Sequence, residues 1–240
     1  MTRRFKLGVP LIVSALVCAC TSASRRDVDP AAPQEQTFSS IPPFKTIEPL
    51  KYRAERSVTY TDNQGTSTIT RTSIARDGDL RREDFEIKSS KIATIQNGGT
   101  RVLLVPDERI YADVNLPSDV AALADLLESG SSPERLLHEQ TPVRSSYERL
   151  GTEEVDGRTT TKYRVVVNNL GGASVSKLET LIWIDEALGM PIRSESKSDG
   201  QQSIMNLTNI SLTVDGSLFQ IPEGYKKVAT TEITQRLGRQ

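Results

Sequence analysis

The sequence is poor in the side chains on which metal centres and nucleophilic active sites depend. It has two cysteines, Cys18 and Cys20, and a single histidine, His138. A zinc site needs several Cys or His ligands and a catalytic triad needs a histidine base, so His138 is expected to have a surface or helix-capping role. The chain also lacks a GxSxG nucleophile elbow and a phosphate-binding glycine loop. These absences predict a protein that is not an enzyme and that carries no metal or other cofactor.

Aromatic residues are few, and the chain has no excess of positive charge. The chain is 5% aromatic and has a formal net charge of -1. Removal of Arg3, Arg4 and Lys6 with an N-terminal signal would make the rest of the chain more acidic, so no nucleic-acid partner is expected. Few aromatic residues together with many Thr, Ser and Val favour strands over helices.

Residues 1–19 have the pattern of an export signal, with an apolar core that is too short to span a membrane. A basic start precedes that core, Leu7–Val17. The sequence Val-Cys-Ala-Cys, which ends at Cys20, then resembles a bacterial lipobox, because an aliphatic residue lies three positions before Cys20 and small Ala19 just before it. This resemblance implies cleavage before Cys20 and acylation with fatty acids such as palmitate. The alternative is an ordinary secretory signal with a chance cysteine.

Lipidated Cys20 is the expected attachment to a membrane. Loss of Cys18 with the signal and acylation of Cys20 leave no thiol for a disulfide. Thr21 and Ser22 follow Cys20 at the place where Asp would resemble an inner-membrane retention signal. The expected location is therefore the cell envelope and, in a Gram-negative cell, the outer membrane facing the periplasm.

The rest of the chain divides by composition into three parts. Residues 20–43 are rich in Ser, Ala, Pro and Gln and have no apolar period, which predicts a lipidated N-terminus and a flexible tether. Residues 44–228 are expected to form a single β domain, and residues 229–240 a polar C-terminal tail. The lead-in Phe44–Leu50 fits either a short helix or an extended segment.

Alternating apolar residues and turn signals predict many short strands within this domain. Tyr52, Ala54, Val58 and Tyr60 share one face of the first strand. A turn that ends in Gly189 connects two later strands, because glycine tolerates a positive φ there. The predicted strands are Tyr52–Tyr60, Thr66–Ala75, Leu80–Lys88, Ile92–Gln96, Arg101–Val105, Arg109–Val114, Val143–Leu150, Glu153–Val155, Thr159–Val167, Leu181–Ile184, a return strand containing Pro191, and Ile204–Val214.

One convincing helix interrupts the strands, Ser118–Glu128. Ser118 is a plausible N-cap, and Val120, Leu123 and Leu127 belong to one apolar stripe at helical spacing. An amphipathic helix of this kind would cover the open side of a curved sheet. Whether it is a movable lid or a fixed part of the core stays open.

Four segments, taken in order, resemble the LolA/LolB-like superfamily of lipoprotein carriers and periplasmic lipoproteins. They are Ile92–Val114, Gly151–Val167, Ile182–Ser196 and Leu218–Val228. The resemblance implies an α+β, mostly antiparallel β fold, a strongly curved incomplete barrel with a helical insert that covers the open face. It also implies a concave apolar face that can hold acyl chains. The resemblance does not extend to the helix that such carriers usually have before the first strand, because prolines limit one here.

A hydrophobic ligand or an envelope protein is the partner that this resemblance implies, and two functions remain. The first is a lipoprotein that binds an acyl chain, another lipoprotein or a different hydrophobic ligand. The second is a structural or interaction lipoprotein with a filled core, in which Tyr163, Trp183 and Phe219 pack within the protein and bind no ligand. Glu153, Glu154 and Asp156 are expected to be a solvated hairpin end. The candidate ligand-binding residues are Val120, Leu123, Leu127, Tyr163, Trp183 and Phe219.

Overall fold

The computed structural model describes residues 37–39, 42–44, 47–87, 89–114, 145–168, 177–198 and 200–238, which fall within one compact unit, Glu35–Gln240. The predicted signal peptide, Cys20, the helix Ser118–Glu128 and His138 lie outside the described residues. The candidate residues Val120, Leu123 and Leu127 are therefore not placed, and their roles stay predictions.

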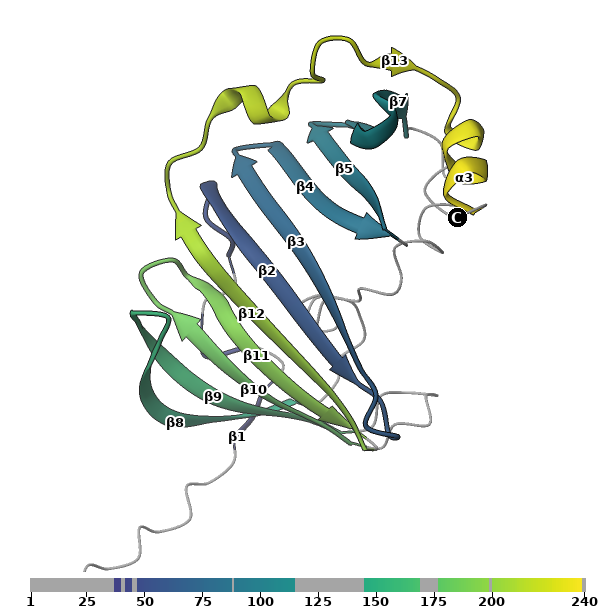
Figure 1. Cartoon of the computed structure of the whole chain (residues 1–240). Helices are drawn as coiled ribbons and strands as arrows, with labels where there is room; N and C mark the ends of the chain where they lie inside the picture. The colour runs from purple at the N-terminus through teal and green to yellow at the C-terminus, as the bar shows by residue number, and fades with distance from the viewer. Residues whose placement is uncertain are drawn as a thin grey trace, which may run out of the picture. The chain divides into compact units, whose positions relative to one another are not determined.

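The described strands form one 13-stranded sheet in the order β1-β8-β9-β10-β11-β12-β2-β3-β4-β5-β6-β7-β13 (Figure 1). Neighbours are antiparallel except β13, which runs parallel to β7. The outermost described strands, β1 and β13, do not pair with each other, so the sheet is open. The strands are β1 Thr37–Ser39, β2 Lys51–Thr61, β3 Ser67–Asp77, β4 Leu80–Ile87, β5 Ser90–Asn97, β6 Thr100–Val105, β7 Ile110–Asp113, β8 Ser145–Val155, β9 Arg158–Asn168, β10 Lys177–Asp185, β11 Met190–Ser198, β12 Gln201–Ser211 and β13 Lys226–Lys227, with 3-10 turns η1 Pro106–Glu108 and η3 Gly216–Phe219. The predicted fold class, mostly antiparallel β in an incomplete barrel, is confirmed.

Local side-chain chemistry accounts for the hairpin turns. In the β10–β11 turn, the Asp185 carboxylate accepts hydrogen bonds from the backbone N–H groups of Ala187 and Leu188 at 2.9 and 3.0 Å. Gly189 then adopts a φ of 70° and donates its N–H to the Asp185 carbonyl at 2.8 Å. A side chain with a Cβ would be strained at that φ, so the predicted turn ends where glycine allows it.

Several strands differ from their predicted limits; β10, for example, begins at Lys177 and not at the predicted Leu181. In β8 and β12 the difference accompanies an irregularity in register. β8 is continuous across the predicted break, and its pairing with β9 shifts between Arg149 and Gly151. β12 stops at Ser211, short of the predicted Val214, and its pairing with β2 shifts between Thr208 and Ser211. An extra residue in one strand disrupts alternation locally without ending the ladder, and a simple period of two does not show it.

The C-terminal residues form a helix, α3 Thr230–Gly238, where the sequence suggested a polar tail. Two apolar residues four positions apart, Ile233 and Leu237, are 0% and 2% exposed. They pack against β5, β6 and β7, and the Thr230 hydroxyl donates to the Asp113 carbonyl at 3.0 Å. So short a stripe among polar residues is a weak signal in sequence, and its burial depends on the sheet that it meets.

Residues directly opposite each other on paired strands share a face, so the registers divide the sheet into two faces. Face A, as we name it, carries Tyr163, Ile182, Met205, Ala54 and Leu103. Face B carries the residues between them on each strand. Apolar side chains follow face A in three clusters, formed by β9 with β10, by β11 and β12 with β2 and β3, and by β4 to β7 with α3. The described apolar cluster of face B is smaller and lies on β5 and β6 under the segment that contains η3.

Candidate functional site

The structure does not bring the described candidate aromatics together. Tyr163 is directly opposite Ile182, which places it on face A, whereas the next residue of β10, Trp183, lies opposite Lys162 on face B. Phe219 packs on the face B cluster of β5 and β6, among strands that the sheet order separates from β10. No one cavity lined by all three aromatics is formed by the described residues.

Trp183 is covered by charged side chains rather than open to a ligand. It is 4% exposed, with the Lys162 ammonium 4.6 Å and the Arg193 guanidinium 5.1 Å from its ring centroid. Its Nε1 donates to Glu153 Oε2 at 2.7 Å, and Lys162 Nζ donates to Glu153 Oε1 at 2.8 Å. The hydrogen bonds from Lys162 and Trp183 lower the pKa of Glu153. This arrangement, the Trp183 cluster, is a closed cation–π stack whose long side chains shield an indole.

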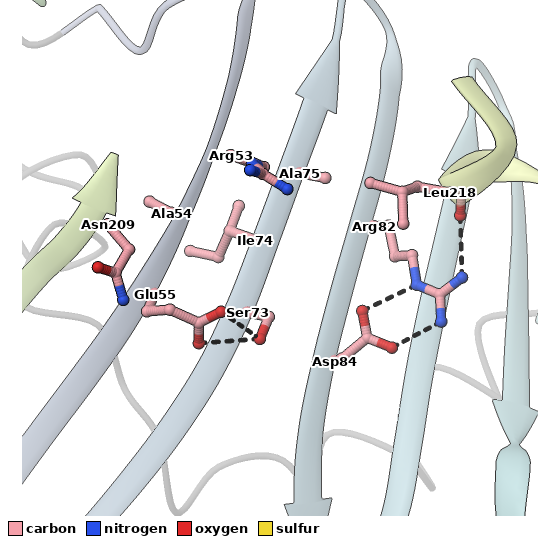
Figure 2. A pocket seen from close by; sticks show the side chains of 10 residues that line it. All are labelled: Arg53, Ala54, Glu55, Ser73, Ile74, Ala75, Arg82, Asp84, Asn209 and Leu218. Atoms are coloured by element: carbon pink, nitrogen blue, oxygen red, sulfur yellow. Dashed lines mark hydrogen bonds and ion pairs between the residues drawn. The ribbon is translucent and has the colours of Figure 1, made fainter. Parts of the chain in front are cut away.

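One cavity lined by described residues is a hollow of about 220 Å³ on face B, between β12, β2, β3, β4 and η3, with both polar and apolar side chains in its lining (Figure 2). Ser73 Oγ lies 2.9 Å from each carboxylate oxygen of Glu55. Arg82 donates to both carboxylate oxygens of Asp84 at 2.7 and 2.8 Å, and to the Leu218 carbonyl at 2.9 Å. These pairs attach the η3 segment to the sheet and leave the acids of the hollow partnered.

The second such cavity, about 260 Å³, lies at the ends of β3, β4 and β5 and is lined by Glu48, Arg76, Gly78, Asp79, Arg81, Gln96 and Gly98. Its centre is the Glu48 carboxylate. Arg81 Nη1 donates to both oxygens of that carboxylate at 2.7 and 2.8 Å, and Arg76 Nη1 donates to Oε2 at 3.0 Å. The Tyr52 hydroxyl also donates to Glu48. We call these four residues the Glu48 site.

The two arginines of this site face each other in the ladder. Arg76 is directly opposite Arg81 in the β3–β4 pair, on face A. Like charges at such positions repel, so the pair needs an anion beside it. Burial alone would raise the pKa of Glu48, but the charge and hydrogen bonds of Arg81, with Tyr52 and Arg76, lower it overall. Glu48 is therefore a carboxylate at neutral pH and supplies the missing negative charge.

The same balance holds Arg81 in its charged form. Burial lowers the pKa of Arg81, while Glu83 and Glu48 raise it by more. A second carboxylate, that of Glu83, lies 2.8 Å from Arg81. With Glu48 in place, the site thus pairs each cation with at least one acid.

None of the four residues of the Glu48 site was predicted from the sequence to be functional. One signal was present, since a tight turn after Arg76 places Arg81 across the hairpin from it. Glu48 had no such signal, because it lies in a lead-in whose conformation the sequence left open. The described part of this lead-in, residues 44 and 47–50, is neither helix nor strand.

No group of three or more His, Cys, Asp or Glu side chains among the described residues is arranged to hold a metal ion. Among the same residues, no helix has the length and apolar character that crossing a membrane requires.

No protein-family model matches the chain, and no curated protein matches it. Its fold is similar to those of several solved structures. A LolA superfamily protein from Nitrosomonas europaea is 9% identical, with 73% of this chain and 92% of that one covered and a TM-score of 0.34. An uncharacterized conserved protein from Thermus thermophilus is 11% identical, with 75% and 91% covered and a TM-score of 0.42. The lipoprotein LppX from Mycobacterium tuberculosis is 14% identical, with 68% and 88% covered and a TM-score of 0.38.

Proposed function

We propose that this protein is an envelope lipoprotein, anchored through Cys20, that binds an acyl chain or another hydrophobic ligand on face A. The observation that carries the proposal is the apolar character of face A across an open sheet, from β9 to β7. An apolar sheet face must be covered, and an open sheet leaves a side at which a ligand can enter. The Val-Cys-Ala-Cys pattern supports the anchoring.

Phe44 supplies a point at which ligand binding on face A can be tested. It is half-buried and lies outside the strands, with its ring centroid 4.7 Å from that of Tyr163 and 5.9 Å from that of Tyr147. Phe219 is a matched control, because it is also half-buried but packs on face B. Truncation of each ring removes a similar apolar area from opposite faces of the sheet.

The experiment is a titration of wild-type protein, Phe44→Ala and Phe219→Ala with a fluorescent fatty acid, together with native mass spectrometry of gently purified protein. We expect copurified lipid, binding about tenfold weaker for Phe44→Ala, and unchanged binding for Phe219→Ala. Thermal melting of each variant separates lost binding from lost folding. If the two truncations weaken fatty-acid binding equally, face A is not the ligand-binding surface.

A structural lipoprotein without a ligand is the second candidate function. Val165, Leu103 and Ile192, from three parts of the sheet, are each 0% exposed, which is what a filled core requires. Absence of lipid in native spectra together with no fatty-acid binding would support this function instead.

The anchoring is tested separately with Cys20→Ala. The variant is expected to lose incorporation of labelled palmitate and to accumulate as an uncleaved or soluble form. Continued labelling would remove the lipoprotein part of the proposal.

A further inference from the structure

We infer that the Arg76–Arg81 pair is an anion site for the carboxylate or phosphate head of a single-chain amphiphile, occupied from within the chain by Glu48. The inference rests on the proposed function, since the chain of the amphiphile would lie on face A. It adds the class of ligand, an anionic amphiphile, and a residue of the protein that competes with it.

The geometry of Glu48 is that of a bound carboxylate. Its two oxygens accept from Arg81 at 2.7 and 2.8 Å, and one of them also accepts from Arg76 at 3.0 Å. Charge-assisted contacts of this kind are how guanidinium groups recognise carboxylates and phosphates. A free anion in the same place would replace the Glu48 carboxylate. It would offset the repulsion between the opposed arginines in the same way.

The residue that joins this polar site to the apolar surface is Tyr52. Its ring is 1% exposed and belongs to the face A cluster that contains Ala54 and Ile74, while its hydroxyl donates to Glu48. A ligand with a charged head at the arginines would therefore place that head next to the buried face A cluster to which Tyr52 belongs. The face B hollow differs, because Arg82 is already held by Asp84 and the Leu218 carbonyl.

Glu48 is placed so that it can leave. It belongs to a segment without regular structure, and its side chain is 30% exposed. Two other contacts, Arg76 with the Glu48 carbonyl at 3.2 Å and the Gly78 N–H with the Leu50 carbonyl at 2.7 Å, attach this segment to the β3–β4 turn. A tethered competitor acts at an effective concentration of about millimolar, so Glu48 weakens anion binding without abolishing it.

Two acids also lie near the pair, Glu83, which contacts Arg81, and Asp79, which lines the cavity. A cation, Arg101, donates to Gln96 at the rim of the same cavity at 3.1 Å. Removal of Glu48 leaves Arg76 without the carboxylate that contacts it and leaves Arg81 with Glu83. An added anion would then contact the two guanidinium groups that Glu48 contacts in the protein without a ligand.

The test is isothermal titration of wild-type protein, Glu48→Ala and Glu48→Gln with dodecanoate, dodecanol and acetate, at a slightly alkaline pH and at low and high salt. We expect both variants to bind dodecanoate roughly tenfold or more tightly than wild type, because the internal competitor is gone. Binding of dodecanol should not change. The gain should shrink at high salt and disappear in Glu48→Ala/Arg81→Gln.

Glu55→Gln is the matched control, since Glu55 is an exposed β2 carboxylate that contacts Ser73 on face B. It should bind dodecanoate as wild type does, and thermal melting shows which variants are folded. Two substitutions at Glu48 keep the test decisive if one of them is unstable.

The outcomes separate this inference from the proposed function. Equal dodecanoate and dodecanol binding in every variant would overturn the anion site and leave hydrophobic binding intact. Acetate bound by Glu48→Ala as tightly as dodecanoate would overturn the amphiphile and indicate a site for free anions. Failure of all three probes to bind any variant would overturn both proposals.

Discussion

The Glu48 site and the Trp183 cluster contain the same kinds of side chain in different arrangements. Each joins one carboxylate, two cations and one aromatic residue. In the Trp183 cluster the cations lie over the ring, and all four residues belong to neighbouring strands, β8 to β11. In the Glu48 site the cations converge on a carboxylate that lies outside the strands. The same kinds of side chain therefore cover the indole in the Trp183 cluster. In the Glu48 site they depend on a carboxylate from a segment outside the sheet.

The largest difference between the two regions should appear when Tyr52 is removed. Tyr52→Ala deletes a ring that is 1% exposed and also the hydroxyl that donates to Glu48. We expect a loss of about 3–5 kcal/mol in the free energy of unfolding, mostly from the cavity. Tyr52→Phe keeps the ring and should lose only about 1 kcal/mol. Urea unfolding measures both, and equal losses would show that the hydroxyl, not the packing, dominates.

A smaller effect is expected from Glu48→Gln. The substitution leaves Arg76 and Arg81 opposed without their shared carboxylate, in a partly buried site. We expect about 1–3 kcal/mol of lost stability, measured by urea unfolding at low salt. A loss that does not change with salt would contradict an electrostatic cause.

The pH dependence of stability should distinguish wild type from Glu48→Gln. The folded-state pKa of Glu48 lies below its ordinary value of 4.5, so the stability that its charge contributes is present above that value. This stability is lost as the pH falls through the folded-state pKa. The difference in melting temperature between the two proteins should be constant near neutral pH and should narrow below about pH 4.5. A difference that persists in acid would show that the charge of Glu48 is not responsible.

The smallest effect is expected from Glu153→Gln. Its carboxylate is 48% exposed, and exposed ion pairs contribute about 0–1 kcal/mol. Lys162 and Arg193 both lie over the Trp183 ring, and we expect these cation–π contacts to persist without the Glu153 charge. Thermal melting should change by less than it does for Glu48→Gln. If Glu153→Gln and Glu48→Gln changed the melting temperature equally, the two carboxylates would contribute equally to stability and the expected difference between the two regions would be wrong.

Interactions between near neighbours in the chain could be predicted from the sequence. The turn after Asp185 needs only that carboxylate, the next backbone N–H groups and Gly189. The hairpins of β2 to β7 likewise follow from alternation and from polar turns, and the sheet order pairs them in sequence. The mostly antiparallel fold was therefore predictable from local signals, whereas the open, incomplete barrel was what the family resemblance implied. The lipobox remains a prediction from sequence alone.

What only the tertiary structure decided are the contacts between residues far apart in the chain. β12 lies against β2, with Ser203 opposite Tyr60, and α3 is stable because Ile233 meets an apolar face that the sheet provides. The bulges in β8 and β12 shift register without a clear local signal. Register decided that Tyr163 and Trp183 face opposite ways, because a strand turns each successive side chain to the other face. The contact between Glu48 and the opposed arginines also depends on the tertiary structure. Only the folded sheet brings the lead-in to the end of the β3–β4 hairpin.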